Sequence, residues 1–344
     1  MPDPRSIVLS VLLPSRPRGS FVESWSLAPT PDSRPLAPEL MRLITTVHEM
    51  KGLAREIRAQ GKSLALVPTM GALHEGHLSL VRRSRRECDV VVVSIFVNPA
   101  QFGTGEDFSR YPRNLEQDLD LLVPLQVDAV FAPGTGDIYP YGFGTFVEPG
   151  ALAASLEGAA RPAHFSGVAT VVVKLFNIVR PDVACFGQKD FQQALLIRHL
   201  VGDLNLDVRL AICPIVREPD GLAKSSRNAY LDAEDRRAAL ALYRSLRRAQ
   251  EIVDAGQIDA GLIVEEMGKT FAAEPRVAPD YAVVVEPARL SSVQRVTPGC
   301  VALVAARVGS PRLIDNWIIA PPGTSDDERI QLALARCSSA ALSC

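Results

Sequence analysis

The sequence contains no apolar run that approaches the roughly 18 residues needed to cross a bilayer. It also has no strong excess of charge, because its 37 basic and 39 acidic residues leave a formal net charge of −2. This balance disfavours a broad basic surface for nucleic acid or anionic lipid, although it leaves room for a small basic pocket. We therefore expect neither a nucleic-acid partner nor a membrane partner.

Cysteine is scarce and dispersed along the chain. None of the six cysteines belongs to a C-x-x-C pair, so their spacing indicates neither a disulfide framework nor a thiolate metal site. We expect them to be small buried apolar residues in a reducing compartment, which predicts a cytoplasmic protein. The six are Cys88, Cys185, Cys213, Cys300, Cys337 and Cys344.

Regular hydrophobic patterning is missing at both ends of the chain. Residues 1–40 are rich in proline and serine, and we predict a disordered N-terminal extension there. The apolar piece Ile7–Leu13 resembles the core of a signal peptide, but only one arginine precedes it and no clear cleavage site of small residues follows. Residues 321–344 are predicted to form a tail with one short helix.

Apolar strands alternate with amphipathic helices between residues 41 and 214. Short runs rich in β-branched residues are separated by longer segments of helical period, a pattern typical of a parallel sheet covered on both faces. We predict an α/β fold here, with a Rossmann-like doubly wound parallel sheet. The main predicted strands are 63–68, 89–99, 127–133, 182–187 and 207–215, and the helices that follow the second, third and fourth of them are 114–126, 166–181 and 190–204.

A second, smaller α+β domain is predicted for residues 215–320. A long helix is expected at 231–256, with Asp232 as its N-cap and Asp235 at the capping-box spacing. Another helix at 258–274 precedes three strand-like runs at 280–287, 300–309 and 312–319. The two domains meet near residue 215.

The stretch PTMGALHEGHLSLV, Pro68 to Val81, contains two histidines three residues apart. A zinc-binding helix of the H-E-x-x-H type places its ligands at i and i+4, but the residue at i+4 from His74 is Leu78. The spacing therefore disfavours a metal site. A helix that merely begins with two histidines is the simplest alternative.

The position of His74 and His77 favours a phosphate site instead. They follow a predicted buried strand, in a glycine-containing turn at the start of the next helix, and open α/β sheets bind ligands at that end of a strand. A helix N-terminus offers free N–H groups and the positive end of its dipole to anions. Gly71 and Gly76 allow close approach of the backbone, and both imidazoles can donate to phosphate oxygens.

The motif H-x-G-H after a first strand resembles that of the nucleotidyltransferase superfamily, which includes the class I aminoacyl-tRNA synthetases. Three further segments follow in order, SIFVNPAQFG, FGQKDFQQ and DGLAKSSRN. With them, residues 41–319 resemble the pantoate–β-alanine ligase family. Another nucleotidyltransferase that adenylates a small acid, and a non-catalytic nucleotide-binding protein, are the alternatives.

The resemblance implies a reaction, its substrates and an assembly. The expected reaction joins pantoate to β-alanine through an acyl-adenylate, with ATP as co-substrate, Mg²⁺ as cofactor and a homodimer as the working form. The carboxylate that attacks ATP is already ionised at neutral pH, since its pKa is about 4, so the first step needs no base. Electrostatic stabilisation of the leaving pyrophosphate should dominate.

The resemblance also assigns roles to individual residues. His77, His74 and Lys189 are the expected catalytic residues, and the family assigns the position of His77 as a proton donor. Asp190 is a candidate metal ligand. The segment around Lys224 is expected to close over ATP as a lid. Three segments are assigned to ATP: Met70, Gly71, Ala72, Leu73, His74, Glu75, Gly76 and His77; Gly187, Gln188, Lys189 and Asp190; and Val216 with Lys224, Ser225, Ser226 and Arg227.

The substrates pantoate and β-alanine are expected at three amide side chains, those of Gln101, Gln193 and Asn98. His164 lies in a further segment, RPAHFSGV, that also resembles the family near its substrate pocket. Many relatives have glutamate at the position of Gln188, so we expect its backbone to matter more than its side chain. Lys224 stands where relatives often have an apolar residue, which adds a cation near the phosphates.

Overall fold

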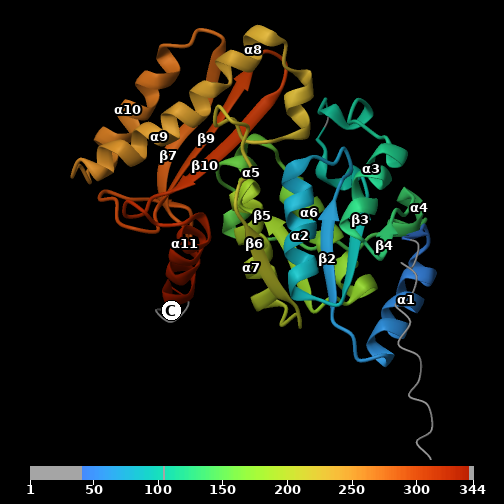
Figure 1. Cartoon of the computed structure of the whole chain (residues 1–344). Helices are drawn as coiled ribbons and strands as arrows, with labels where there is room; N and C mark the ends of the chain where they lie inside the picture. The colour runs from blue at the N-terminus through green and yellow to red at the C-terminus, as the bar shows by residue number, and fades with distance from the viewer. Residues whose placement is uncertain (1–40, 104, 341–344) are drawn as a thin grey trace, which may run out of the picture. The chain divides into compact units, whose positions relative to one another are not determined.

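The computed structural model describes residues 41–103 and 105–340. The predicted extension at 1–40 lies outside the described residues. Two sheets organise the rest, a parallel one in residues 42–213 and an antiparallel one in residues 277–318 (Figure 1). None of the helices in the described ranges is long and apolar enough to cross a membrane.

The first sheet has six strands in the order β1-β4-β3-β2-β5-β6, and every pair in it is parallel. After the edge strand β1, which pairs with β4, the chain enters the middle of the sheet at β2 and moves outward through β3 and β4. It then returns to the other side of β2 for β5 and β6. This reversal is the switch point of a doubly wound sheet, so the predicted fold class is confirmed. The strands are β1 (Arg42–Ile44), β2 (Leu64–Thr69), β3 (Val90–Ile95), β4 (Ala129–Phe131), β5 (Val183–Gly187) and β6 (Arg209–Cys213).

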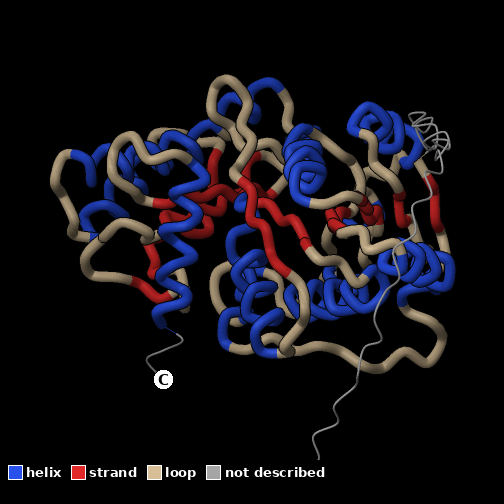
Figure 2. Tube along the Cα trace, turned by 60° about the horizontal axis from the view of Figure 1, so that its bottom comes forward, coloured by secondary structure: helices blue, strands red, loops and turns tan. Residues whose placement is uncertain are grey.

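Helices cover both faces of this sheet, as Figure 2 shows. Alternate residues of β2 face opposite layers: Leu64 and Leu66 belong to one apolar cluster, and Ala65 and Val67 to another. The strand is therefore buried on both sides, which explains why it has no polar residue between Leu64 and Pro68. The principal helices are α1 (Val47–Ala59), α2 (Glu75–Glu87), α3 (Leu115–Leu122), α6 (His164–Val179) and α7 (Phe191–Asp203).

Two boundaries in this domain differ most from the prediction. Strand β3 ends at Ile95 rather than at residue 99, because Asn98 caps a short 3-10 turn, η1 (Pro99–Gln101). The predicted helix 114–126 ends at Leu122 and continues as a 3-10 turn that contains Pro124. Short elements that the pattern did not indicate include α4 (Thr135–Ile138) and α5 (Glu157–Ala160).

The second sheet has the order β10-β9-β7-β8 and is antiparallel, which confirms the small α+β domain. Asp232 caps the first helix as predicted, but the long helix is interrupted at Ala239. Helices α9 and α10 share an apolar cluster with β7, β9 and β10. The elements are α8 (Ala233–Ala238), α9 (Leu240–Asp254), α10 (Ala260–Ala272), β7 (Val277–Glu286), β8 (Ser291–Ser292), β9 (Val301–Val308) and β10 (Arg312–Ile318).

The segment after residue 320 contains helix α11 (Asp326–Ala340), which is longer than the short helix we expected. Its Ile330, Ala333 and Cys337 are buried in a cluster with residues of β10 and α7. The five cysteines of the described residues are all free and buried, in agreement with the role predicted for them.

Candidate active site

His74 and His77 hold each other in place at the start of α2. His74 is the N-cap: the Gly76 N–H donates to its Nδ1 at 3.1 Å, and the His74 N–H donates to Nδ1 of His77 at 3.3 Å. Because each Nδ1 accepts a hydrogen bond, the proton of each neutral ring sits on Nε2. The site thus offers two Nε2–H donors, on imidazole rings whose centroids are 4.2 Å apart.

Both imidazoles are neutral at physiological pH. Burial, followed by the charges of Lys189 and Lys224, lowers the pKa of His74 to about 4. Burial, followed by the neighbouring His74 ring, lowers the pKa of His77 to about 3. The two residues therefore present hydrogen bonds rather than positive charge, and the predicted proton transfer from His77 would need a rise of its pKa in the reacting complex.

A carboxylate far along the chain shapes the turn formed by residues 70–75, which we call the histidine turn. Asp118 of α3, which is 3% exposed, accepts from the backbone N–H of Ala72 at 3.0 Å and of Leu73 at 2.7 Å. Gly71 and Ala72 both have positive φ, and a Cβ at Gly71 would lie 2.9 Å from Oδ2 of Asp118. Asp118 was missed at the sequence level, because nothing local marks a contact over this separation.

The loop after β5 is held by the second domain. Asn316 of β10 donates from Nδ2 to the carbonyl oxygens of Gln188 and Lys189, both at 3.0 Å, and Nε2 of Gln188 donates to Oδ1 of Asn316 at 2.9 Å. The side chain of Gln188 is buried and joins the two domains. Our expectation that the Gln188 backbone matters more than its side chain therefore misses this structural role.

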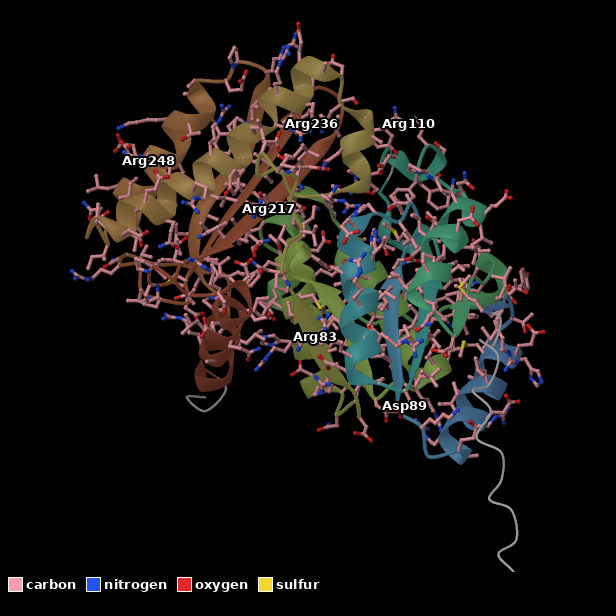
Figure 3. The ribbon with its side chains drawn as sticks, viewed as in Figure 1. Arg83, Asp89, Arg110, Arg217, Arg236 and Arg248 are labelled. Carbon is pink, nitrogen blue, oxygen red and sulfur yellow. The ribbon has the colours of Figure 1, made fainter. Side chains whose placement is uncertain are left out.

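Arg217 belongs to the same junction and is labelled in Figure 3. Its guanidinium forms two hydrogen bonds with the buried carboxylate of Asp315, at 2.7 and 3.0 Å, and lies over the rings of Tyr243 and Trp317. These contacts fix the strand that carries Asn316.

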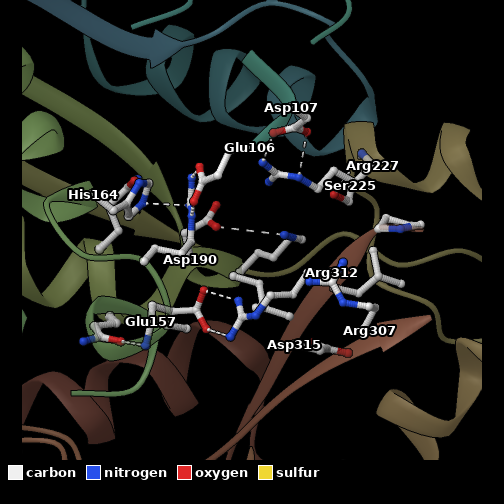
Figure 4. A pocket seen from close by; sticks show the side chains of 18 of the residues that line it. Glu106, Asp107, Glu157, His164, Asp190, Ser225, Arg227, Arg307, Arg312 and Asp315 are labelled. Carbon is white, nitrogen blue, oxygen red and sulfur yellow. Dashed lines mark hydrogen bonds and ion pairs between the residues drawn. The ribbon is translucent and has the colours of Figure 1, made fainter. Parts of the chain in front are cut away.

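The segment 216–227 brings two further cations to the site. Lys224 is ion-paired with Glu218 at 2.7 Å, and Arg227 with Asp107 at 3.1 Å (Figure 4). Ser225 caps the short helix η6 (Ser226–Tyr230) by accepting from the Arg227 N–H. A ligand phosphate would have to compete with these two carboxylates for the lysine and the arginine.

His164 links Arg161 to the loop that carries Gln101. Its Nδ1–H donates to the carbonyl of Gln101 at 2.8 Å, so Nε2 is the atom that accepts from Arg161 at 3.1 Å. Burial, followed by the charge of Arg161, lowers the pKa of His164 to about 4. Arg161 also pairs with Glu106 at 2.5 Å. Arg161 and Glu106 were not among the predicted site residues.

Asn98 and Gln101 differ in what they offer a ligand. Asn98 is 1% exposed, and its two amide hydrogens go to Oε1 of Gln101 and to the carbonyl of Gly167, each at 3.0 Å. Asn98 therefore holds the side chain of Gln101, and it has no amide hydrogen left to donate to a substrate. Nε2 of Gln101 lies 3.1 Å from Sδ of Met70, beside the histidine turn.

A cavity of about 220 Å³ brings most of the predicted residues together. Four of the predicted residues, Gly71, Ala72, Leu73 and Glu75, form the histidine turn without lining this cavity, and Gln188 is turned toward Asn316. The predicted residues that do line it are Met70, His74, Gly76, His77, Asn98, Gln101, Gly187, Lys189, Asp190, Gln193, Val216, Lys224, Ser225, Ser226 and Arg227.

A larger cavity of about 810 Å³, seen from close by in Figure 4, adjoins the first. The two cavities share Lys189, Asp190 and Gln193 in their linings. Its far wall is closed by Glu157, which accepts two hydrogen bonds from Arg312, at 2.6 and 2.8 Å. The two cavities together form a site with room for a nucleotide and a second small molecule.

Asp190 is the single acidic residue among those that line the smaller cavity. Its carboxylate is half exposed and lies 3.9 Å from Nζ of Lys189. The described residues include no cluster of three or more histidine, cysteine or acidic side chains that could hold a metal on their own. One carboxylate fits a hard cation that takes its other ligands from phosphate oxygens and water.

Comparison with known proteins identifies close relatives. The family model Pantoate-beta-alanine ligase matches residues 42–318. A pantothenate synthetase of Roseiflexus castenholzii is 53% identical over 279 residues, covering 81% of this chain and 99% of the relative. One from Thermotoga neapolitana is also 53% identical, over 81% of this chain and 100% of the relative.

Two solved structures extend the comparison. The pantothenate synthetase of Thermus thermophilus matches with a TM-score of 0.78 and 45% identity, covering 82% of this chain and 100% of that one. A ligase from Francisella tularensis, described as complexed with β-γ ATP and β-alanine, matches with a TM-score of 0.68 and 36% identity, over 81% of this chain and 98% of that one.

Proposed function

This chain belongs to the pantoate–β-alanine ligase family, and we propose that the two cavities form the active site in which it condenses (R)-pantoate with β-alanine. The reaction consumes ATP and yields pantothenate, AMP and pyrophosphate. The observation that carries the proposal is the convergence of four separated segments, represented by His77, Gln101, Lys189 and Ser225, around one cavity.

The first half-reaction makes pantoyl-adenylate. The ionised carboxylate of pantoate attacks the α-phosphorus of ATP, and the bond to pyrophosphate breaks. The Nε2–H groups of His74 and His77 donate to the phosphates, and Lys189 opposes the negative charge that grows on the leaving group. Preorganised donors of this kind are typically worth about 2.7–4 kcal/mol each in the transition state.

The second half-reaction forms the amide. A carboxylate resists attack by an amine, but the adenylate provides a good leaving group. The amine of β-alanine attacks the acyl carbon and AMP departs with the pair of electrons of the broken bond. We propose that Gln193 contacts the acyl group as the amine approaches, a role supported by its position in the lining of both cavities. Closure of the segment around Lys224 would keep water from the mixed anhydride.

We propose that Mg²⁺ accompanies ATP and that Asp190 contacts it, because Asp190 is the one carboxylate among the residues that line the smaller cavity. When bound, the ion would neutralise charge on the phosphates.

The cellular setting is proposed from the family resemblance. We propose a homodimer in the cytoplasm. The free thiols of the five cysteines within the described residues suit a reducing compartment.

The deciding experiment is isotope exchange between pyrophosphate and ATP. Exchange should require pantoate, and addition of β-alanine should convert the bound adenylate to pantothenate, identified by mass spectrometry. Exchange without pantoate would identify a different nucleotidyltransferase, and absence of both exchange and product would refute a ligase.

A further inference from the structure

The groups around Asn98 permit only one orientation of its side-chain amide. The backbone N–H of Ala100 can only donate, and it lies 3.2 Å from one end of the amide. The carbonyl of Gly167 can only accept, and it lies 3.0 Å from the other end. The oxygen of Asn98 must therefore face Ala100 and its NH₂ must face Gly167.

This orientation determines that of Gln101. The second hydrogen of the Asn98 NH₂ points to the Gln101 amide at 3.0 Å, so the Gln101 atom in that position is its oxygen. Its NH₂ is then the other end of the amide, 3.1 Å from Sδ of Met70, and both residues line the smaller cavity. A substrate group at this position must be a hydrogen-bond acceptor, such as a carboxylate or hydroxyl oxygen.

Tyr139 completes the chain of hydrogen bonds from outside the site. It follows the short helix α4, lines neither of the two cavities described above, and donates from its hydroxyl to Oδ1 of Asn98 at 2.8 Å. Burial raises the pKa of this phenol to about 12, so it remains a donor at all physiological pH values. Oδ1 of Asn98 thus receives two hydrogen bonds and has no lone pair left to attract the Gln101 NH₂.

Close packing protects this arrangement. Helix α6 touches η1 at Gly167, where a Cβ would lie 2.2 Å from the carbonyl oxygen of Ala100. Only glycine permits this approach, which brings the Gly167 carbonyl to Asn98. The amide of Asn98 is consequently held from three elements: η1 itself, α6 through Gly167, and the end of α4 through Tyr139.

We propose that Tyr139 is a positioning residue that acts through Asn98 to keep the Gln101 NH₂ directed at an acceptor oxygen of pantoate. The proposal rests on the proposed function, because it takes the ligand of Gln101 to be pantoate. It predicts that loss of the Tyr139 hydroxyl weakens pantoate binding and leaves ATP binding alone.

The test measures steady-state kinetics of full-length Tyr139→Phe. The KM for pantoate should rise about 3- to 10-fold, as expected for one lost hydrogen bond, while the KM for ATP and kcat stay within about twofold. Tyr141→Phe is the matched control, since Tyr141 is two residues away and fully exposed. It should leave all three constants unchanged.

A double-mutant cycle separates positioning from general destabilisation. In a Gln101→Ala background, Tyr139→Phe should have no further effect on the KM for pantoate, because the group it positions is gone. Asn98→Asp provides a second route: its carboxylate cannot donate to Gln101, so the glutamine should turn and its carbonyl should face the substrate, raising the KM for pantoate beyond the effect of Tyr139→Phe.

Several results would overturn the inference. These are an unchanged KM for pantoate in Tyr139→Phe, an equal rise in the KM for ATP, or an effect of full size in the Gln101→Ala background. If Tyr139→Phe is poorly folded, an unchanged KM in Asn98→Asp would refute the inference. Failure of the proposed function is distinct, because the unmodified protein would then show no pantoate-dependent exchange.

Discussion

Asn316 of the second domain lies with its side-chain amide 3.0 Å from the backbone carbonyl of Lys189 in the first. The same amide group also binds the carbonyl of Gln188. The loop that presents the principal cation of the site is therefore completed by a strand from the other domain. The second domain contributes to the active site directly, in addition to the segment 216–227.

Asn316→Asp tests this coupling. A carboxylate of the same shape would face two carbonyl oxygens without a hydrogen to donate, so the loop should shift and displace Lys189. We expect kcat/KM to fall on the order of 10- to 100-fold, which corresponds to about 1–3 kcal/mol for buried groups left without partners. Steady-state kinetics check this result, and Asn177→Asp, an exposed position on α6, should behave as the unmodified protein.

His77→Asn separates two roles of one imidazole. The asparagine oxygen can replace Nδ1 as the acceptor of the His74 N–H, but no group replaces the Nε2–H donor. Activity in the exchange assay should fall on the order of 100- to 1,000-fold, as for loss of an oxyanion donor, with little change in the unfolding midpoint. Lys189→Ala should lose activity to a similar extent. Near-normal kcat/KM in either variant would remove that residue from the mechanism.

The positions of the four site segments could be predicted because each one follows a strand of a parallel sheet or the domain junction. The carboxyl ends of parallel strands share one edge, so His77 after β2, Gln101 after β3 and Lys189 after β5 had to lie near one another. Fold class followed from the same alternation of apolar strands and helices. These are properties of short stretches of sequence and need no knowledge of distant contacts.

The supporting residues could not be predicted in this way. Asp118, Tyr139 and Asn316 each act on a loop that is remote in the sequence, and each stands in a segment that reads as ordinary helix, turn or strand. The same limitation applies to the neutral state of His74, because burial and the nearby lysines exist only in the folded chain. Sequence patterns identified residues that line the smaller cavity better than the residues that hold them in place.

The lowered pKa values of His74 and His77 predict a dependence of stability on pH. In the unfolded chain both titrate near 6.5, whereas in the folded chain they titrate at about 4 and about 3. Between these pH values the unfolded state binds more protons than the folded state. The contribution of the two histidines to the free energy of unfolding is therefore complete above pH 6.5 and declines as the pH falls toward 4. The decline should be at most roughly 1.4 kcal/mol per pH unit for each histidine.

Denaturant unfolding from pH 7.5 to 4.5 measures this slope. His77→Asn removes one titrating group, so its slope should be smaller than that of the unmodified protein across the same range. His48→Asn is a suitable control, since His48 lies on the exposed side of α1, away from the site. Parallel curves for His77→Asn and the unmodified protein would contradict a depressed pKa at His77.

Asp118→Asn tests the support of the histidine turn. The asparagine oxygen can accept from one of the two backbone N–H groups, of Ala72 or Leu73, but its NH₂ would face the other and leave that buried donor without a partner. The free energy of unfolding should fall by about 1–3 kcal/mol, and pyrophosphate exchange should slow because His74 follows the turn directly. Asp120→Asn on the same helix is exposed and supplies the control. If Asp118→Asn matched that control in both urea unfolding and exchange, the turn would not depend on this carboxylate.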